Sequence, residues 1–394
     1  MLQDNQAPLQ LNPTEAYKRA LHTTLAVTVF AIATLCLWQL FKDTSLKYIL
    51  YFMPPVFLLI NVVIQRGVLD VDPRAATALC LYAVMSMASL AATSKFDFFA
   101  QRDTIIICGY LALFALPIRV LPSLADGVLV TLIAACLVVA YNDGVVLQFD
   151  LLGSKGIMET NLAFPIGILL IYYVFDRSWT RALITFALFF ITFKRIAILA
   201  FMVVLAIEFV IWVTADRLSR RFVATSIALS ACIASVFMIE IVEYLAFYLN
   251  IDGINAAALS LGRTNFAAPL WEQIHAGSID NLLFGFGPGG ADRALWVVRS
   301  GANPHNDWLK VLFEYGYIGL ILFHVVMYMM FPRGRVGTAL YIYTAIIFTT
   351  DNTLIYMQYF AFVALIAHLP FTLRRTQIVP MNFINRQTDG VFVR

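Results

Sequence analysis

The stretch ALITFALFFITFKRIAILAFMVVLAIEFVIWVT, residues 182–214, is an apolar run in which only Lys194, Arg195 and Glu208 are charged. A helix that crosses a bilayer needs about 20 mostly apolar residues. The run is too long for one such helix and slightly short for two, and its basic pair divides it. It therefore predicts a hairpin of two membrane helices, whose tip at Lys194 and Arg195 is drawn into the bilayer.

The composition of the whole chain agrees with this reading. Of 394 residues, 61% are hydrophobic and 13% are charged, and the mean hydropathy is +0.81. A soluble domain has about 45–50% apolar and about 25% charged residues, so the composition excludes a soluble globular enzyme and a disordered chain. The 27 basic and 24 acidic residues nearly cancel, which argues against nucleic acid as a partner.

Similar apolar runs along the chain predict an all-α, polytopic membrane protein with about 12 transmembrane helices. The predicted spans are 20–41, 46–65, 75–94, 103–121, 124–141, 161–175, 179–193, 196–214, 223–249, 309–331, 337–350 and 353–371. We expect residues 1–394 to form a single transmembrane domain. The first span lacks the pattern of a cleaved signal peptide, so we expect it to remain as an anchor.

The positions of the basic residues predict the orientation of the chain. With the N-terminus inside, most of the Lys and Arg residues in connections fall on the inner side, including the cluster Arg217, Arg220 and Arg221. Both termini are then cytoplasmic, and the longest connection, residues 250–308, is a large outer loop. Within it, residues 265–276 predict a short interfacial helix with Trp271 as its aromatic anchor.

The outer loop ends in NPHNDWLK, residues 303–310, where the chain enters the tenth predicted span. A histidine at this junction is accessible, titrates near neutral pH and is held by a rigid helix, so His305 is a candidate general base. The alternative is a polar cap on that helix. Asn306 or Asp307 either orients the imidazole or caps the helix.

The run from His305-Asn306 through nine residues to Gly316, and through two more to Gly319, resembles the signature of the O-antigen ligase and polymerase superfamily. Its members are bacterial membrane enzymes that ligate or polymerise lipid-linked glycans. Arg195, at the start of a helix, and Arg263, in Leu-Gly-Arg-Thr, resemble two arginines of that family in order and spacing.

Two further features bear on this resemblance. The segment LFGFGPGG, residues 283–290, resembles the glycine-rich turn that precedes the family's histidine. Gly287 and Gly289 in this turn either let the backbone approach a glycan or phosphate, or simply close the loop. Lys194 is a departure, because the family usually has a small hydroxyl residue before this arginine. It leaves open whether Lys194 shares in binding phosphate.

The resemblance implies an inverting glycosyltransferase that needs no metal or other cofactor. In this reading His305 deprotonates an acceptor sugar hydroxyl, while Arg195 and Arg263 stabilise a departing diphosphate. Substrate binding is assigned to Lys194, Asn306, Asp307, Gly287 and Gly289. The alternative for the basic pair at 194–195 is a hairpin tip whose side chains reach the lipid headgroups.

The resemblance also implies the partners. The donor is a glycan on undecaprenyl diphosphate, whose tail stays in the bilayer of the bacterial inner membrane, and the site faces the periplasm. A ligase would use lipid A core as acceptor, and a polymerase would use a growing O-antigen or exopolysaccharide glycan. The histidine spacing and the short outer segment at 142–160 favour the ligase. A transporter of lipid-linked sugars is the alternative from another class, but the distinctive charges gather on one face beside the loop.

Other acidic and sulfur-containing residues carry weaker signals. Asp70-Val71-Asp72 has the spacing of a metal-binding acidic pair, but it falls in a predicted inner loop opposite the site. The five cysteines lie in apolar runs, so neither a disulfide nor a zinc site is predicted. Glu240 and Glu243, one helical turn apart, are expected either to pair with an arginine of the site or to line the acceptor path.

Overall fold

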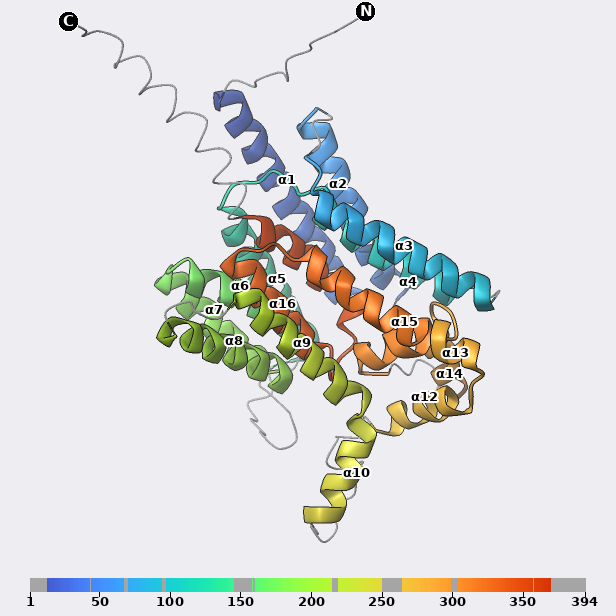
Figure 1. Cartoon of the computed structure of the whole chain (residues 1–394). Coiled ribbons are helices and arrows are strands. Elements are labelled where there is room, and N and C mark those ends of the chain that lie inside the picture. Colours follow the sequence, from blue (N-terminus) through green and yellow to red (C-terminus); the bar gives the residue numbers. More distant parts are fainter. Residues whose placement is uncertain are drawn as a thin grey trace, which may run out of the picture.

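The computed structural model describes residues 13–42, 44–66, 70–93, 97–144, 158, 160–214, 219–249, 264–298, 304–356 and 358–369. Of the described residues, 83% are helical and none lies in a strand, which confirms the all-α prediction. The elements (Figure 1) are α1 (Pro13–Leu40), η1 (Ser45–Phe52), α2 (Met53–Ile64), α3 (Pro73–Thr93), α4 (Phe98–Ala115), α5 (Leu124–Asp143), α6 (Ala163–Phe175), α7 (Trp179–Thr192), α8 (Arg195–Val213), α9 (Arg220–Val236), α10 (Met238–Leu249), α12 (Thr264–Ala276), α13 (Ile279–Phe284), α14 (Gly290–Val298), α15 (Asp307–Met330), α16 (Arg335–Ile347), η2 (Thr353–Ile355) and a last helix, Gln358–Leu369.

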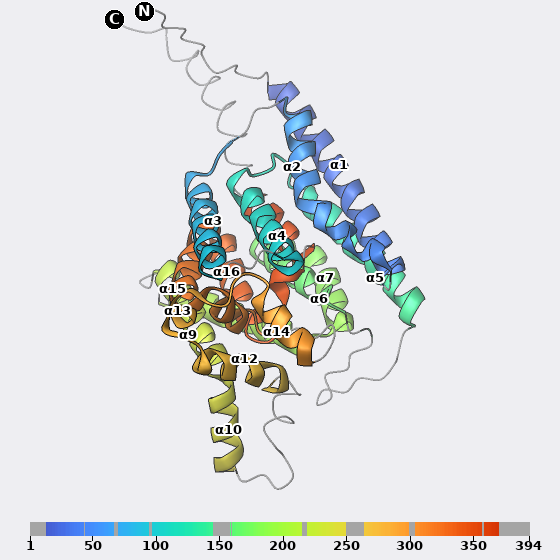
Figure 2. The ribbon, with the colours of Figure 1, turned by 90° about the vertical axis from the view of Figure 1, so that its right-hand side faces the viewer.

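Five of these helices, α1, α3, α5, α8 and α15, are long and apolar enough to cross a membrane. Shorter apolar helices occupy Tyr48–Ile64, Ala163–Phe175, Trp179–Thr192, Arg335–Ile347 and Gln358–Leu369. The positions of these helices follow the predicted spans, while the full count of 12 stays a prediction. The ninth predicted span, 223–249, is different: it divides at Phe237 into α9 and α10, and α10 projects away from the bundle (Figures 1 and 2).

Contacts between helix ends define two opposite ends of the bundle. At the first, which we call the basic end, Arg181 near the start of α7 binds Asp126 near the start of α5 at 2.8 Å. Glu208, toward the end of α8, binds the first residues of α9 and α16 there, Arg220 at 2.5 Å and Arg335 at 2.7 Å. Helices α5, α7, α9 and α16 therefore run away from the basic end, and α8 runs toward it.

The opposite end, which we call the loop end, carries the connections that follow α1, α5 and α9. Asn142, near the end of α5, donates to the backbone oxygen of Gln39, near the end of α1, at 2.8 Å. Ser235, at the end of α9, bonds to Asn306, which precedes α15. Helices α10 and α12 lie at the bottom of both views, far from the start of α1 at the top (Figures 1 and 2).

The hairpin predicted for residues 182–214 is present as α7 and α8. Helix α7 ends at Thr192, and α8 begins at Arg195 after Lys194 in an extended conformation, with φ −125° and ψ 113°. The backbone N–H of Met158, from the segment that follows α5, donates to Ile191 near the tip at 3.1 Å. Because α7 runs away from the basic end, this tip lies at the loop end.

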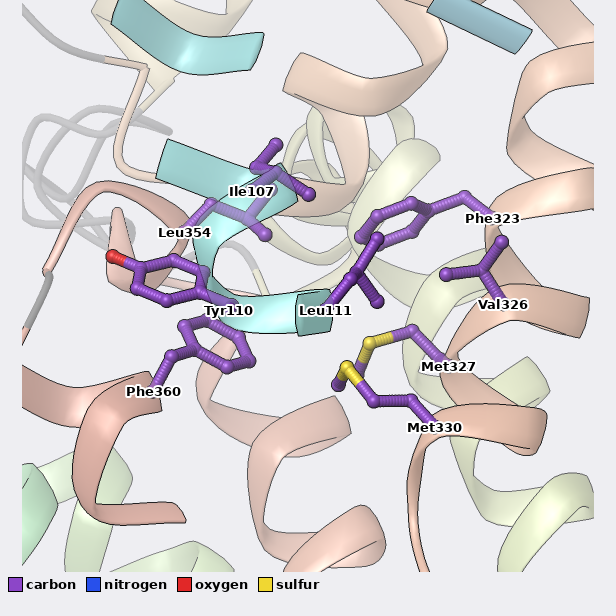
Figure 3. A pocket seen from close by; sticks show the side chains of 9 residues that line it. All are labelled: Ile107, Tyr110, Leu111, Phe323, Val326, Met327, Met330, Leu354 and Phe360. Carbon is purple, nitrogen blue, oxygen red and sulfur yellow. The ribbon is translucent and has the colours of Figure 1, made fainter. Parts of the chain in front are cut away.

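The centre of the bundle is formed by α6, α16 and the last helix, which are buried on nearly all sides. This explains why their sequences are apolar all round rather than on one face. A small apolar cavity lies between α4, α15 and the last helix, lined in part by Tyr110, Met327, Met330 and Phe360 (Figure 3). Its lining contains no charged side chain, so we interpret it as a packing gap rather than a substrate site.

Helix α15 is broken at Gly316, where the backbone has φ 68° and ψ −172°. The glycine-rich turn docks on this break: the N–H of Phe286 donates to the carbonyl of Phe313 at 2.9 Å, and the N–H of Gly287 to that of Glu314 at 3.1 Å. A Cβ added to Gly316 would lie 2.4 Å from the carbonyl carbon and oxygen of Leu283. The close approach of the two backbones therefore requires glycine.

A third segment meets this crossing. The hydroxyl of Ser89, in α3, lies 2.9 Å from the carbonyl oxygen of Phe284 and 2.8 Å from that of Glu314. It therefore touches both backbones where the glycine-rich turn crosses α15. Residues from the N-terminal quarter, the loop and the tenth predicted span thus form one junction.

Replacement of Gly316 by alanine tests the crossing. The left-handed backbone costs an L-residue about 1–2 kcal/mol, and the overlap with Leu283 adds about 1–3 kcal/mol. Gly144→Ala is the matched control, because Gly144 has φ 75° and its added Cβ meets nothing within 4 Å. Thermal unfolding of the purified protein in detergent should show a larger fall in Tm for Gly316→Ala. Equal falls for the two variants would contradict the close approach.

Candidate functional site

His305 lies at the loop end, immediately before the residue that caps α15. It is half-buried, and its φ is 48°. Histidine is enriched several-fold among the few side-chain-bearing residues in this left-handed region, where the strain costs of order 1–3 kcal/mol. The ring of Phe266 in α12 lies 6.0 Å from the imidazole, centroid to centroid. The imidazole is therefore located where the start of α15 meets the loop helices.

Asn306 holds the backbone next to this histidine. Its side chain is fully buried, and its Oδ1 accepts from the N–H of Leu309 at 2.9 Å, which makes Asn306 the N-cap of α15. The same oxygen accepts from the hydroxyl of Ser235 at 2.6 Å, while Nδ2 donates to the carbonyl of Ser235 at 2.9 Å. Asn306 therefore caps α15 and ties the start of this helix to the end of α9.

Asp307 fastens the start of α15 on its other side. Its carboxylate is fully buried, and Oδ2 accepts from the hydroxyl of Thr353 at 2.8 Å and the N–H of Leu354 at 3.0 Å. The N–H of Asp307 donates to the carbonyl of Phe348 at 2.9 Å. With Asn306 and Asp307 both anchored, the backbone at His305 has little freedom to leave its strained conformation.

Sequence reasoning missed the polar segment that Asp307 contacts. Asp351 and Asn352 are 4% and 2% exposed, and the hydroxyl of Tyr356 donates to Asp351 at 2.9 Å. Oδ1 of Asp307 and Oδ1 of Asn352 are buried, with no hydrogen-bond partner among the described residues. The signal was available, because an acid and an amide stand between two apolar runs at residues 349–353.

The basic residues of the predicted site are only partly described. Lys194 and Arg195 are half-buried at the tip of the α7–α8 hairpin, at the same end of the bundle as His305. Arg263 lies outside the described residues, directly before Thr264, the first residue of α12. Helix α12 is the element that brings Phe266 against the imidazole, so the chain at Arg263 leads into a helix that touches the candidate base.

The two glycines assigned to substrate binding contact the protein's own chain. Gly287 has φ 87°, and a Cβ added there would lie 2.6 Å from the hydroxyl of Thr93. Gly289 has φ 68°, and its N–H bonds to the carboxylate of Glu314. These contacts explain why glycine occupies both positions: it lets the chain form the turn that closes the loop. A role in binding substrate stays a prediction.

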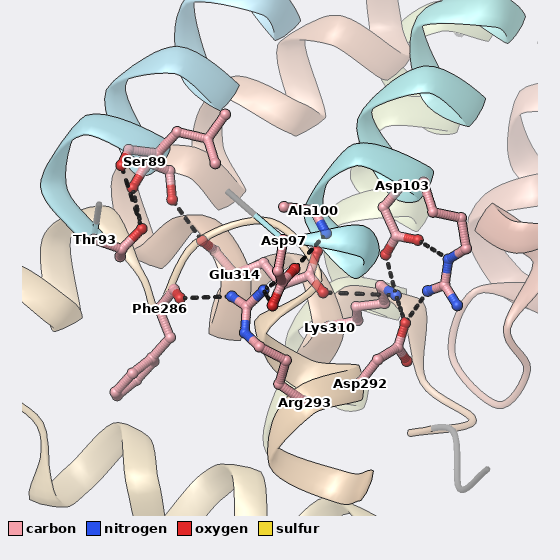
Figure 4. Close-up of polar contacts among 12 residues, drawn as sticks. Ser89, Thr93, Asp97, Ala100, Asp103, Phe286, Asp292, Arg293, Lys310 and Glu314 are labelled. Carbon is pink, nitrogen blue, oxygen red and sulfur yellow. Dashed lines mark hydrogen bonds and ion pairs between the residues drawn. The ribbon is translucent and has the colours of Figure 1, made fainter. Parts of the chain in front are cut away.

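A buried ion cluster joins α4, α14 and α15 (Figure 4). We use this name for Arg102 and Asp103 of α4, Asp292 of α14, and Lys310 and Glu314 of α15. The ammonium of Lys310 lies 2.7 Å from Asp103, 3.0 Å from Asp292 and 3.6 Å from Glu314. The guanidinium of Arg102 binds Asp103 at 2.6 Å and also contacts Asp292.

The pKa of Asp292 shows how strongly the charges of the ion cluster interact. Burial alone would raise the pKa of this carboxyl, but Lys310 and Arg102 outweigh burial and hold the pKa below its usual value. Asp292 therefore stays ionised above that pKa, and its pairing is lost only as the pH falls through it. Over the neutral range it remains a charged link between α14 of the loop and the helices α4 and α15.

The acidic residues that carried weaker signals in the sequence lie away from His305 or have side chains outside the described residues. Asp72 accepts from the N–H of Arg74 at 2.9 Å, so it caps the start of α3. Its own N–H donates to Ala115, at the end of α4, far from His305. Glu240 is exposed on α10, and the side chain of Glu243 lies outside the described residues. Within the described part of the chain, no group of three or more His, Cys, Asp or Glu residues is placed to hold a metal.

Residues 181–324 match the model of a protein family described as O-antigen ligase. The match covers the α7–α8 hairpin, the loop, His305 and the broken part of α15. The match supports the O-antigen ligase-like superfamily, which the motifs predicted. That family supports a bacterial membrane glycosyltransferase of the O-antigen ligase or polymerase type, and it implies a lipid-linked glycan and the bilayer as partners. Comparisons with curated proteins and with solved structures found no match.

Replacement of Asn306 by alanine tests how the start of α15 is anchored. Loss of an N-cap costs about 0.5–2 kcal/mol, and loss of the two buried hydrogen bonds to Ser235 adds about 0.5–1.5 kcal/mol each. Ser278→Ala is the matched control, because Ser278 caps α13 through Asn281 at an exposed position. Thermal unfolding should show a much larger fall in Tm for Asn306→Ala. A loss no greater than that of Ser278→Ala would mean that the buried bonds to Ser235 contribute nothing.

Proposed function

We propose that this protein is an inverting glycosyltransferase of the O-antigen ligase type. It transfers a glycan from undecaprenyl diphosphate to a sugar hydroxyl of lipid A core at the periplasmic face of the inner membrane. The observation that carries the proposal is the position of His305. It is held in a strained backbone conformation by Asn306 and Asp307, at the same end of the bundle as Lys194 and Arg195, inside the matched family region.

In the reaction, His305 removes the proton from the acceptor hydroxyl as that oxygen attacks the anomeric carbon of the donor. The bond between the anomeric carbon and the diphosphate breaks on the opposite side, so the anomeric configuration inverts. The imidazole then carries the proton, and undecaprenyl diphosphate carries the electron pair of the broken bond. A positioned base of this kind contributes about 10²–10⁴-fold to the rate.

The leaving group needs positive charge as its negative charge grows. Arg195 and Arg263 supply it, and their planar guanidinium groups can each hold two phosphate oxygens. Lys194 adds a third cation beside Arg195. Because these side chains neutralise the diphosphate, the proposed reaction uses neither a metal nor an organic cofactor. The Asp70 and Asp72 pair takes no part, and Asp72 is engaged in capping α3 at the basic end.

The orientation rests on the distribution of arginines. The basic end carries Arg19, which reaches the carbonyl of Gln65 at the end of α2, together with Arg181, Arg220 and Arg335. Basic residues favour the cytoplasmic side of a membrane. We therefore propose that the basic end and both termini are cytoplasmic, and that the loop end is periplasmic.

The decisive experiment gives the purified enzyme one lipid-linked repeat, with and without lipid A core. The proposal predicts a single transfer of the repeat to lipid A core and no reaction of the repeat with itself. Gel separation of the products distinguishes the outcomes. A ladder formed without lipid A core would identify a polymerase of O-antigen or exopolysaccharide repeats, and movement of intact donor across vesicles without transfer would identify a transporter.

His305→Asn tests the base without changing the backbone, because asparagine, like histidine, tolerates a positive φ. Transfer should fall by about 10²–10⁴-fold while Tm stays close to that of the wild type. His305→Ala should be equally inactive. His275→Ala is the control, since His275 is exposed on α12 and bonds only locally, through Nδ1 to the carbonyl of Trp271. Wild-type transfer by His305→Asn would exclude His305 as the base.

The proposed cation set also predicts the effect of chelators. Transfer in excess EDTA should proceed at the rate measured without it, because Arg195, Arg263 and Lys194 already neutralise the diphosphate. The measurement is the initial rate after dialysis against EDTA, with and without added Mg²⁺ or Mn²⁺. A rate that collapses in EDTA and returns with either ion would refute metal independence.

A further inference from the structure

We infer that Lys310 is a positioning residue for the transfer reaction: through the buried ion cluster it fixes the helical segment that begins beside His305 and holds the loop helices against it. The inference rests on the proposed function and deepens it. Lys310 does not contact substrate in this scheme. It acts through the backbone that carries the base.

The first step is the placement of Lys310 within α15. The segment 307–315 is separated from the rest of α15 by the break at Gly316, so it is a short helix of its own. His305 precedes it by two residues, and Lys310 lies in its middle. A rotation or shift of this short helix would move the imidazole directly, because His305 immediately precedes Asn306, whose side chain caps its first turn.

The second step is the convergence of three elements on one ammonium group. Lys310 is 3% exposed, and its partners Asp103 and Asp292 are 1% and 4% exposed. Asp103 belongs to α4, Asp292 to α14 of the loop, and Lys310 to the helix of the base (Figure 4). Loss of the ammonium would remove one of the two cations that bind Asp103 and Asp292 among the described residues, so the three elements would no longer be held in one arrangement.

The third step connects α14 to the surroundings of the imidazole. Helix α14 packs against α12, and the buried residues Ala291 and Leu295 of α14 share one core with Ala267 and Leu270 of α12. Phe266, next to Ala267, is the residue whose ring lies against His305. The cluster therefore fixes His305 from both sides, through its own helix and through the loop.

An ion cluster is suited to this task for a physical reason. Burying charges carries a desolvation penalty that their attraction repays only in good geometry, so such a cluster is weak evidence for stability and can instead fix one arrangement of its elements. An apolar contact of the same size would allow α14 to slide. Arg102 and Lys310, which each bind both Asp103 and Asp292, hold it in one register.

Three variants test this inference in the transfer assay. Lys310→Arg keeps the charge and should retain most of the wild-type kcat. Lys310→Met removes it, and kcat per folded enzyme should fall by about 10- to 100-fold, the effect of a small misplacement of a reacting group, while the KM for donor changes much less. Lys310→Met combined with Asp292→Asn removes one charge of each sign, so it should fold better than Lys310→Met alone and still show the loss of kcat.

Glu208→Gln is the matched control, because Glu208 joins a partly buried ion group at the basic end. It should lower Tm without changing kcat per folded enzyme. The inference is overturned if the Lys310→Met/Asp292→Asn variant keeps the wild-type kcat, or if its loss of activity only follows its loss of folded protein. A wild-type enzyme without transfer activity, or an active His305→Asn variant, would instead refute the proposed function itself.

Discussion

The break in α15 at Gly316 leaves the carbonyl groups of Phe313 and Glu314 without their helical partners, and inside a membrane protein such groups must find partners within the chain. They accept instead from the N–H groups of Phe286 and Gly287, in the glycine-rich turn of the loop. This single constraint joins the loop to a membrane helix. The ion cluster, the cap at Asn306 and the contact of Phe266 with His305 are all arranged around the short helix that the break creates.

The few charges of this apolar chain fall into groups with different tasks. At the basic end, Arg181, Arg220 and Arg335 pair with Asp126 and Glu208 between helix ends. At the loop end, the cations and carboxylates of the ion cluster pair with one another. The basic pair at residues 194–195 lies at the hairpin tip, at the same end as His305. Charge at the loop end is therefore divided between holding the site and, in the proposed function, meeting the diphosphate.

Local patterns predicted much of the fold. The apolar run at 182–214 predicted the α7–α8 hairpin, and the amphipathic segment at 265–276 predicted α12, because both signals lie within one short stretch. The division of the ninth span at Phe237 was missed, since residues 223–249 are apolar on both sides of the break. The candidate site was inferred from the motif at His305, and the dual anchoring by Asn306 and Asp307 appeared only with α9 and η2 in place.

The ion cluster could not be predicted from the sequence, because its residues come from separate parts of the chain. Arg102 and Asp103 stand at the edge of a predicted span, Asp292 stands alone in the loop, and Lys310 and Glu314 lie in the span that follows. Nothing in their spacing links them, because they meet only through tertiary packing. The glycines of the turn were noticed for their residue type, but their partner, the backbone of α15, is visible only in the folded chain.

The hydroxyl of Ser89 has a consequence for the order in which the protein is made. Ser89 and Glu314, which it contacts, are separated by 225 positions in the chain. During synthesis, α3 is complete and inserted in the bilayer long before the loop and α15 emerge from the ribosome. The junction beneath the candidate site therefore closes among the last events of biogenesis, and a chain that stops before α15 lacks the backbone that the glycine-rich turn and Ser89 bind.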